Sequence, residues 1–123
     1  MIPSMQYSVL LVDDDPAFRA LARRIVSAAG LGVVGEAGTI AAAISAALDL
    51  RPDTALVDVG LPDGDGMSLA LKLTSLPWRL QVLLTSTDPD AASPDDVRRC
   101  GANGFVPKAD LPNAPLKRLL TTE

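Results

Sequence analysis

The alternation of short apolar runs with helical segments constrains the fold of this 123-residue chain more than any other feature. The run Val9-Leu10-Leu11-Val12 is typical of a buried strand, and comparable runs return roughly every 20 to 25 residues, as expected of βα units. We expect strands near residues 8–12, 33–36, 54–58, 81–85 and 104–107. The pattern predicts one α/β domain with a parallel sheet and a chain long enough for a substantial core.

Helix signals stand between these strands. Asp15 can cap the first helix, Pro16 suits its first turn and Gly30 can end it. Its apolar stripe, spaced by three and four residues, comprises Phe18, Leu21, Ala22, Ile25, Val26 and Ala29. A second helix should start at Thr39 and stop before Pro52, with an inward face formed by Ile40, Ala43, Ile44, Ala47 and Leu48. The remaining helices are expected near 66–76, after a capping box at Ser93-Pro94-Asp95-Asp96, and at about 113–121.

Four of the predicted strands deliver a polar side chain at their carboxyl end. Asp13 and Asp14 follow the first strand and Asp58 ends the third, whereas Thr85 and Lys108 mark the ends of the last two. Sites in open α/β sheets are built at this edge, so these side chains should converge. Carboxylates from two strands, a hydroxyl and a lysine are suited to bind a divalent cation and a phosphoryl group.

The crowded carboxylates indicate which cation and which chemistry to expect. Asp13, Asp14 and Asp58 would repel one another and raise their pKa values unless a cation compensated them. Mg²⁺ prefers oxygen ligands and keeps waters that a phosphoryl donor can displace. Asp58 precedes a Gly/Pro loop and can attack phosphorus, while Lys108 and the Thr85 hydroxyl would stabilise the phosphoryl oxygens.

The composition excludes several classes of function. The chain has no histidine, which removes Ser-His and Cys-His catalysis and most zinc sites. A net charge of −4 with scattered arginines argues against nucleic-acid binding by this domain. The single cysteine, Cys100, suits burial and a reducing cytoplasm. No signal peptide or bilayer-spanning segment is indicated, so we expect a cytoplasmic protein without membrane contact.

The motifs as a set resemble the receiver domain of two-component response regulators, and the resemblance covers nearly the whole chain. The segments that carry it are Val9-Leu10-Leu11-Val12-Asp13-Asp14-Asp15-Pro16, Asp58-Val59-Gly60-Leu61-Pro62-Asp63-Gly64-Asp65-Gly66, Leu83-Leu84-Thr85-Ser86 and Gly101-Ala102-Asn103-Gly104-Phe105-Val106-Pro107-Lys108. Each segment alone is weak, but their order and separations together are specific. The resemblance implies a flavodoxin-like (βα)5 fold, a three-layer sandwich with a five-stranded parallel sheet of order 2-1-3-4-5.

The resemblance also implies how the acidic pocket works. Asp58 would be the phosphorylated aspartate and would contribute to the Mg²⁺ site. Asp14 would bind Mg²⁺ directly, Asp13 largely through water, and the Gly60 carbonyl would offer a further ligand. Lys108 would pair with Asp58 and later with the phosphoryl group.

A conformational switch is implied as well. Thr85 would move to hydrogen-bond the phosphoryl oxygen, and Phe105 would turn into the space that it leaves. The face formed by the fourth helix, fifth strand and fifth helix would then change, and a homodimer through this face is a further expectation. Two departures stand out: Phe105 has no hydroxyl, and Ala109 follows Lys108 where the family often has proline.

The implied function is a phosphoacceptor switch in a phosphorelay, which takes its phosphoryl group from a histidine kinase or a phosphotransfer protein. It catalyses only its own phosphorylation and slow dephosphorylation, and is not an enzyme acting on a metabolite. We expect one receiver domain over residues 1–123 and no effector domain in this chain. A DNA-binding effector outside the chain is compatible with these residues.

Two alternatives stay open on the sequence. Asp13 and Asp15 have the Asp-x-Asp spacing of haloacid-dehalogenase-type phosphohydrolases, although Ala17 departs from that motif and the chain is short for that fold with a cap. The second alternative is a receiver-like module that dimerises without being phosphorylated. Retention of the full Asp/Asp/Thr/Lys set argues against it.

Overall fold

The structure is a computed structural model that describes residues 7–121, and its elements alternate along the chain as the sequence predicts. The main strands are β1 (Ser8–Val12), β2 (Gly32–Ala37), β3 (Thr54–Asp58), β6 (Gln81–Ser86) and β7 (Gly104–Pro107). The α-helices are α1 (Pro16–Ala28), α2 (Ile40–Leu50), α3 (Gly66–Thr74), α4 (Pro94–Cys100) and α5 (Leu116–Leu120). Two short strands, β4 (Gly60–Leu61) and β5 (Gly64–Asp65), and the 3-10 helix η1 (Lys108–Asn113) complete this part of the chain.

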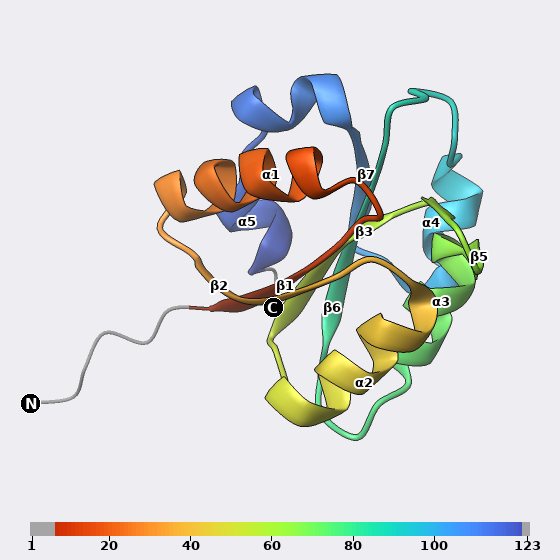
Figure 1. The fold of residues 1–123 in the computed structure, drawn as a ribbon. Coiled ribbons are helices and arrows are strands. Elements are labelled where there is room, and N and C mark those ends of the chain that lie inside the picture. The colour runs from red at the N-terminus through yellow and green to blue at the C-terminus, as the bar shows by residue number, and fades with distance from the viewer. Residues whose placement is uncertain (1–6, 122–123) are drawn as a thin grey trace, which may run out of the picture.

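Within residues 7–121, five strands form one parallel sheet in the order β2-β1-β3-β6-β7. Numbered within this sheet alone, the order is 2-1-3-4-5, which confirms the expected flavodoxin-like fold. Helices α1 and α5 cover one face, and α2, α3 and α4 cover the other (Figure 1). A hydrophobic core lies on each face of the sheet, and alternate residues of β1 point into one or the other. Leu10 and Val12 pack on the α2–α4 side, whereas Val9 and Leu11 pack on the α1–α5 side.

The helix starts follow the capping chemistry in the sequence. The Asp15 side chain accepts a hydrogen bond from the Ala17 N–H, and Thr39 accepts one from the Ala42 N–H. Ser93 and Asp96 form the reciprocal capping box of α4. In the part of the chain that the structure describes, no helix is long and apolar enough to cross a membrane.

Some sequence expectations were wrong in detail. Leu21 and Leu48 are 48% and 57% exposed, because each lies at the margin of its helix's apolar stripe rather than over the sheet. Helix α3 ends at Thr74, before Pro77, and α5 begins only at Leu116. The residues between Lys108 and Asn113 form η1, which the apolar periodicity did not predict.

Candidate functional site

The predicted site residues gather at the carboxyl edge of the sheet. Asp13 follows β1, Asp58 is the last residue of β3, Thr85 lies near the end of β6, and Lys108 follows β7. Parallel pairing places Asp58 directly opposite Thr85. Asp13, Asp58 and Thr85 are buried, and we call the site that they form with Asp14 and Lys108 the acidic pocket.

A lysine bridges two carboxylates at the centre of this pocket. The Lys108 Nζ lies 2.7 Å from the Asp13 Oδ2 and 3.3 Å from the Asp58 Oδ2. The same ammonium lies 4.1 Å from the centre of the Phe18 ring, in cation–π geometry. The sequence placed Phe18 only in the core stripe of α1, and nothing in its spacing distinguished it from a core residue.

The pocket has the donor set of a divalent-cation site. Carboxylate oxygens of Asp13, Asp14 and Asp58 lie within 4.8 Å of one another, with Asp14 exposed at the rim. Three carboxylates beside the single ammonium of Lys108 leave net negative charge, which suits Mg²⁺. The Gly60 N–H donates to the Asp58 Oδ1 at 3.1 Å, so the loop after β3 turns back toward the pocket.

Burial and like charge shift the acid–base properties of the pocket. Burial raises the pKa of Asp58, and the neighbouring Asp13 carboxylate raises it further, against the opposing hydrogen bond from Gly60 and the charge of Lys108. For Lys108, burial acts to lower the pKa, but the hydrogen bonds and charges of Asp13 and Asp58 outweigh it and the pKa is raised. Lys108 therefore stays protonated, and a further cation would favour ionised Asp58.

Thr85 presents a hydroxyl that the surrounding protein does not use. Its Oγ1 is buried and has no hydrogen-bond partner among residues 7–121. Buried polar atoms are normally paired, so an orphaned hydroxyl opposite Asp58 fits a ligand oxygen at this position. The donor set and this hydroxyl together fit a metal-assisted phosphoryl site.

Phe105 lies outside the acidic pocket. It pairs in register with Leu84, whereas Thr85 pairs with Val106, so its Cβ leaves from the α2–α4 side of the sheet. The half-buried Phe105 side chain lines a groove of about 420 Å³ between α4 and β7. This groove lies on the face that, according to the family resemblance, would change in the conformational switch.

Asp63 has a structural role that sequence reasoning missed. The Asp63 Oδ1 accepts a hydrogen bond from the Ile40 N–H at 2.7 Å, and its Oδ2 accepts one from the Ala41 N–H at 3.2 Å. These bonds lower the pKa of Asp63 and tie the loop after β3 to the start of α2. Its place in a Pro-Asp-Gly turn was the only sequence signal, and that signal indicated a turn alone.

Comparisons with known proteins agree with this architecture. Residues 9–119 match the family model of the response regulator receiver domain. The chain is 41% identical over 115 residues to the DNA-binding transcriptional activator DevR/DosR of Mycobacterium tuberculosis, covering 89% of this chain and 51% of that protein. It is 32% identical over 109 residues to a protein-glutamate methylesterase/protein-glutamine glutaminase of Hahella chejuensis, covering 87% of this chain and 31% of that protein.

A solved structure shows the same likeness. The signal receiver domain of the response regulator NarL from Mycobacterium tuberculosis superposes with a TM-score of 0.77 at 33% identity, covering 93% of this chain and 96% of that chain. The chain thus spans about half the length of the transcriptional relative and nearly the whole of an isolated receiver domain. The phosphohydrolase and the unphosphorylated interaction module are not favoured by these matches. The chain belongs to the response regulator receiver domain family of two-component systems.

Proposed function

We propose that Asp58 is the phosphoacceptor of this receiver and that the pocket around it holds Mg²⁺ through Asp13, Asp14, Asp58 and the Gly60 carbonyl. The observation that carries the proposal is the convergence of Lys108, Asp13 and Asp58 opposite a buried, unpartnered Thr85 hydroxyl. When bound, Mg²⁺ would supply charge neutralisation to the phosphoryl oxygens.

The step follows from the positions of the chain's own groups. A carboxylate oxygen of Asp58 forms a bond to phosphorus as the P–N bond to the donor histidine breaks, and the bonding pair stays on the imidazole nitrogen. Lys108, already 3.3 Å from Asp58, is placed to pair with the transferred group. Thr85 supplies the hydroxyl donor from the facing strand.

We extend the proposal to the partners and the output. A histidine kinase or phosphotransfer protein, meeting this receiver in the cytoplasm, would supply the phosphoryl group. The transition would carry Thr85 toward the phosphoryl oxygen and Phe105 inward, and so change the face made by α4, β7 and α5. That face would mediate dimerisation or contact with an effector domain, which in a DNA-binding relative would carry the nucleic-acid contacts.

Intact mass spectrometry tests the central claim. Wild type and Asp58→Asn are each incubated with Mg²⁺ and acetyl phosphate. We expect one phosphoryl adduct on wild type and none on the variant, and no adduct in either when EDTA replaces Mg²⁺. Equal adducts on both proteins would place the phosphoacceptor elsewhere, and an unmodified wild type would contradict the proposed function.

A further inference from the structure

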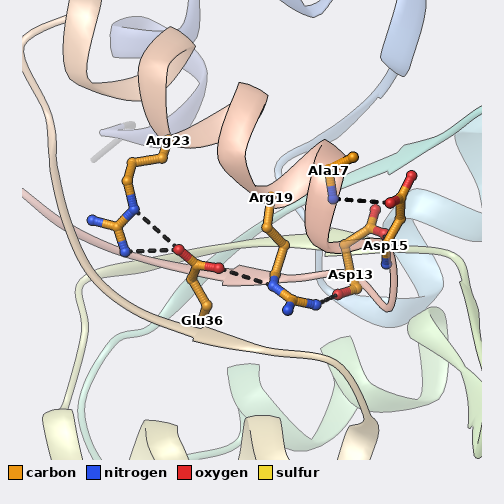
Figure 2. A network of polar contacts seen from close by, with 6 residues as sticks. All are labelled: Asp13, Asp15, Ala17, Arg19, Arg23 and Glu36. Carbon is orange, nitrogen blue, oxygen red and sulfur yellow. Dashed lines mark hydrogen bonds and ion pairs between the residues drawn. The ribbon is translucent and has the colours of Figure 1, made fainter.

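Hydrogen bonds to its N–H, its side chain and its carbonyl hold Asp13 in place. The Asp13 N–H donates to the Ala37 carbonyl at 2.9 Å, and the Asp13 Oδ1 accepts from the Asp15 N–H at 2.9 Å. The Asp13 carbonyl in turn accepts a hydrogen bond from the Arg19 Nη1 at 2.5 Å (Figure 2). Strand β2 and helix α1 therefore both hold the residue from which the acidic pair begins.

Arg19 is itself oriented by a second carboxylate. Its Nε donates to the Glu36 Oε1 at 2.9 Å, while the Glu36 Oε2 accepts from Arg23 Nε at 3.0 Å and Nη2 at 2.8 Å (Figure 2). The Arg23 hydrogen bond is the main reason that the pKa of Glu36 is lowered, so Glu36 remains ionised. Arg19 is the less exposed of the two arginines, at 21% against 47% for Arg23, and it is the one that reaches the Asp13 carbonyl.

The chain leaves room for this arrangement at Gly38. A Cβ at that position would lie 3.4 Å from the Arg19 Nη1 and 3.9 Å from the Asp13 carbonyl oxygen. Both atoms of the hydrogen bond therefore pass beside the glycine. These are ordinary van der Waals distances, so Gly38 is in direct contact with the hydrogen-bonded pair.

We propose that Arg19 is a positioning residue for the metal-binding carboxylates, acting through the Asp13 carbonyl, with Glu36 fixing the direction of its guanidinium. The carbonyl belongs to the peptide plane that joins Asp13 to Asp14, so holding that plane restricts the directions in which both side chains leave the loop. The inference rests on the proposed Mg²⁺ site, and it assigns the affinity of that site in part to a residue that is not a ligand.

A purely electrostatic role and a positioning role for Arg19 predict opposite changes in Mg²⁺ affinity when this side chain is removed. Loss of a positive charge near three carboxylates would, by electrostatics alone, strengthen the binding of a cation. Loss of the hydrogen bond that orients the Asp13–Asp14 peptide would weaken binding, because the carboxylates would have to be ordered when the metal arrives. The direction of the change therefore separates the two accounts.

The test measures Mg²⁺ affinity by calorimetry for wild type, Arg19→Met, Arg19→Lys and Arg24→Met. We expect Arg19→Met to raise the Kd about tenfold, the lower end of the usual effect of removing an outer-shell partner. Arg19→Lys should recover part of the affinity, since an ammonium can still donate to the carbonyl but lacks the planar guanidinium whose separate nitrogens reach the carbonyl and Glu36. Arg24→Met makes the same charge change at an exposed position of α1 and should leave the Kd nearly unchanged. An unchanged or lower Kd in Arg19→Met would overturn the proposal.

Hydrogen exchange in the metal-free protein tests the hold of Arg19 on the loop independently of whether the pocket binds Mg²⁺. We expect faster exchange of the Asp13 and Asp15 amides in Arg19→Met, while the core amides of β3 and β6 exchange as in wild type. If wild type bound no Mg²⁺, the proposed metal site would fail, and faster exchange at these two amides would still support the hold of Arg19 on the loop. Unchanged exchange there would refute that hold whatever the metal data.

Discussion

Lys108 decides the charge balance of the acidic pocket. Its ammonium contacts both buried carboxylates and packs against the Phe18 ring, so it is fixed on three sides. Of the interactions that shift the Asp58 pKa, those from Gly60 and Lys108 lower it, against burial and Asp13. Lys108 thus keeps Asp58 closer to its reactive, ionised form even before a metal binds.

Removing Lys108 should therefore raise the pKa of Asp58 further in the metal-free protein. Replacement of the ammonium in Lys108→Met removes one of the two interactions that oppose burial and the Asp13 carboxylate, and leaves only the hydrogen bond from Gly60 against them. A ¹³C NMR titration of the Asp58 carboxyl in EDTA measures this shift relative to wild type. Lys117→Met, an exposed charge change on α5, serves as the control and should leave the titration in place. A pKa that stayed constant or fell in Lys108→Met would contradict the balance described here.

The site residues differ in how much the sequence could say about them. The positions of Asp13, Asp58, Thr85 and Lys108 at the pocket follow from strand ends that a parallel sheet aligns. Their contacts could not be predicted, because side-chain directions at strand ends depend on loops without a period. Phe18 illustrates this limit: the same helical spacing serves a core residue and one that covers the lysine.

At the scale of elements, the connection between β3 and α3 is closely packed against the site. The Gly66 N–H donates to the Val59 carbonyl at 2.7 Å. A Cβ on Gly66 would lie only 2.1 Å from the Asp58 carbonyl oxygen, which is closer than atoms can approach. The start of α3 is therefore pressed against the backbone of the proposed phosphoacceptor.

Gly66→Ala should destabilise the fold by about 1–3 kcal/mol, as overpacking at a rigid backbone contact does. Gly60→Ala, two residues after Asp58, is the matched control, because a Cβ there meets nothing within 4 Å. That control should change the stability by no more than about 1 kcal/mol and in the stabilising direction if at all. Urea unfolding of both variants measures the difference. Equal free energies of unfolding for the two variants would contradict this prediction, because they would mean that α3 can move away from Asp58 without loss of stability.

Some elements could be predicted from the sequence pattern and others could not. Apolar runs located the strands, and apolar periodicity located α1 and α2, since each buries one face on the sheet. A proline marked the end expected for α3, and a capping box marked the start of α4. The hairpin of β4 and β5 has strands of two residues each, too short for any period to register. Helix η1 contains Pro112, and Ala114 is extended, so the last helix starts at Leu116 rather than at about 113.

Over the whole molecule, the packing of the fold holds acidic side chains close together at one edge of the sheet, although their negative charges repel one another. The raised pKa of Asp58 means that the folded state holds a proton more tightly than the unfolded chain, whose Asp pKa is near 3.8. Its ionised form is therefore unfavourable at neutral pH, and this cost is relieved as the pH falls through the folded-state pKa. A divalent cation would relieve the same cost at neutral pH without protonation.

Mg²⁺ should accordingly raise the melting temperature of wild type, because a ligand that binds only the folded state stabilises it. At one hundred times the Kd the gain is about 2.7 kcal/mol, or on the order of 10 °C for a domain of this size. Asp14→Ala is the control: this side chain is exposed, so its loss should hardly change the metal-free melting temperature while removing most of the gain. Differential scanning calorimetry with and without Mg²⁺ at neutral pH measures both effects. Below the folded-state pKa of Asp58 protons compete with the metal, so the wild-type gain should shrink as the pH falls. A gain of equal size in Asp14→Ala, or one that persisted in acid, would place the cation somewhere other than this carboxylate pocket.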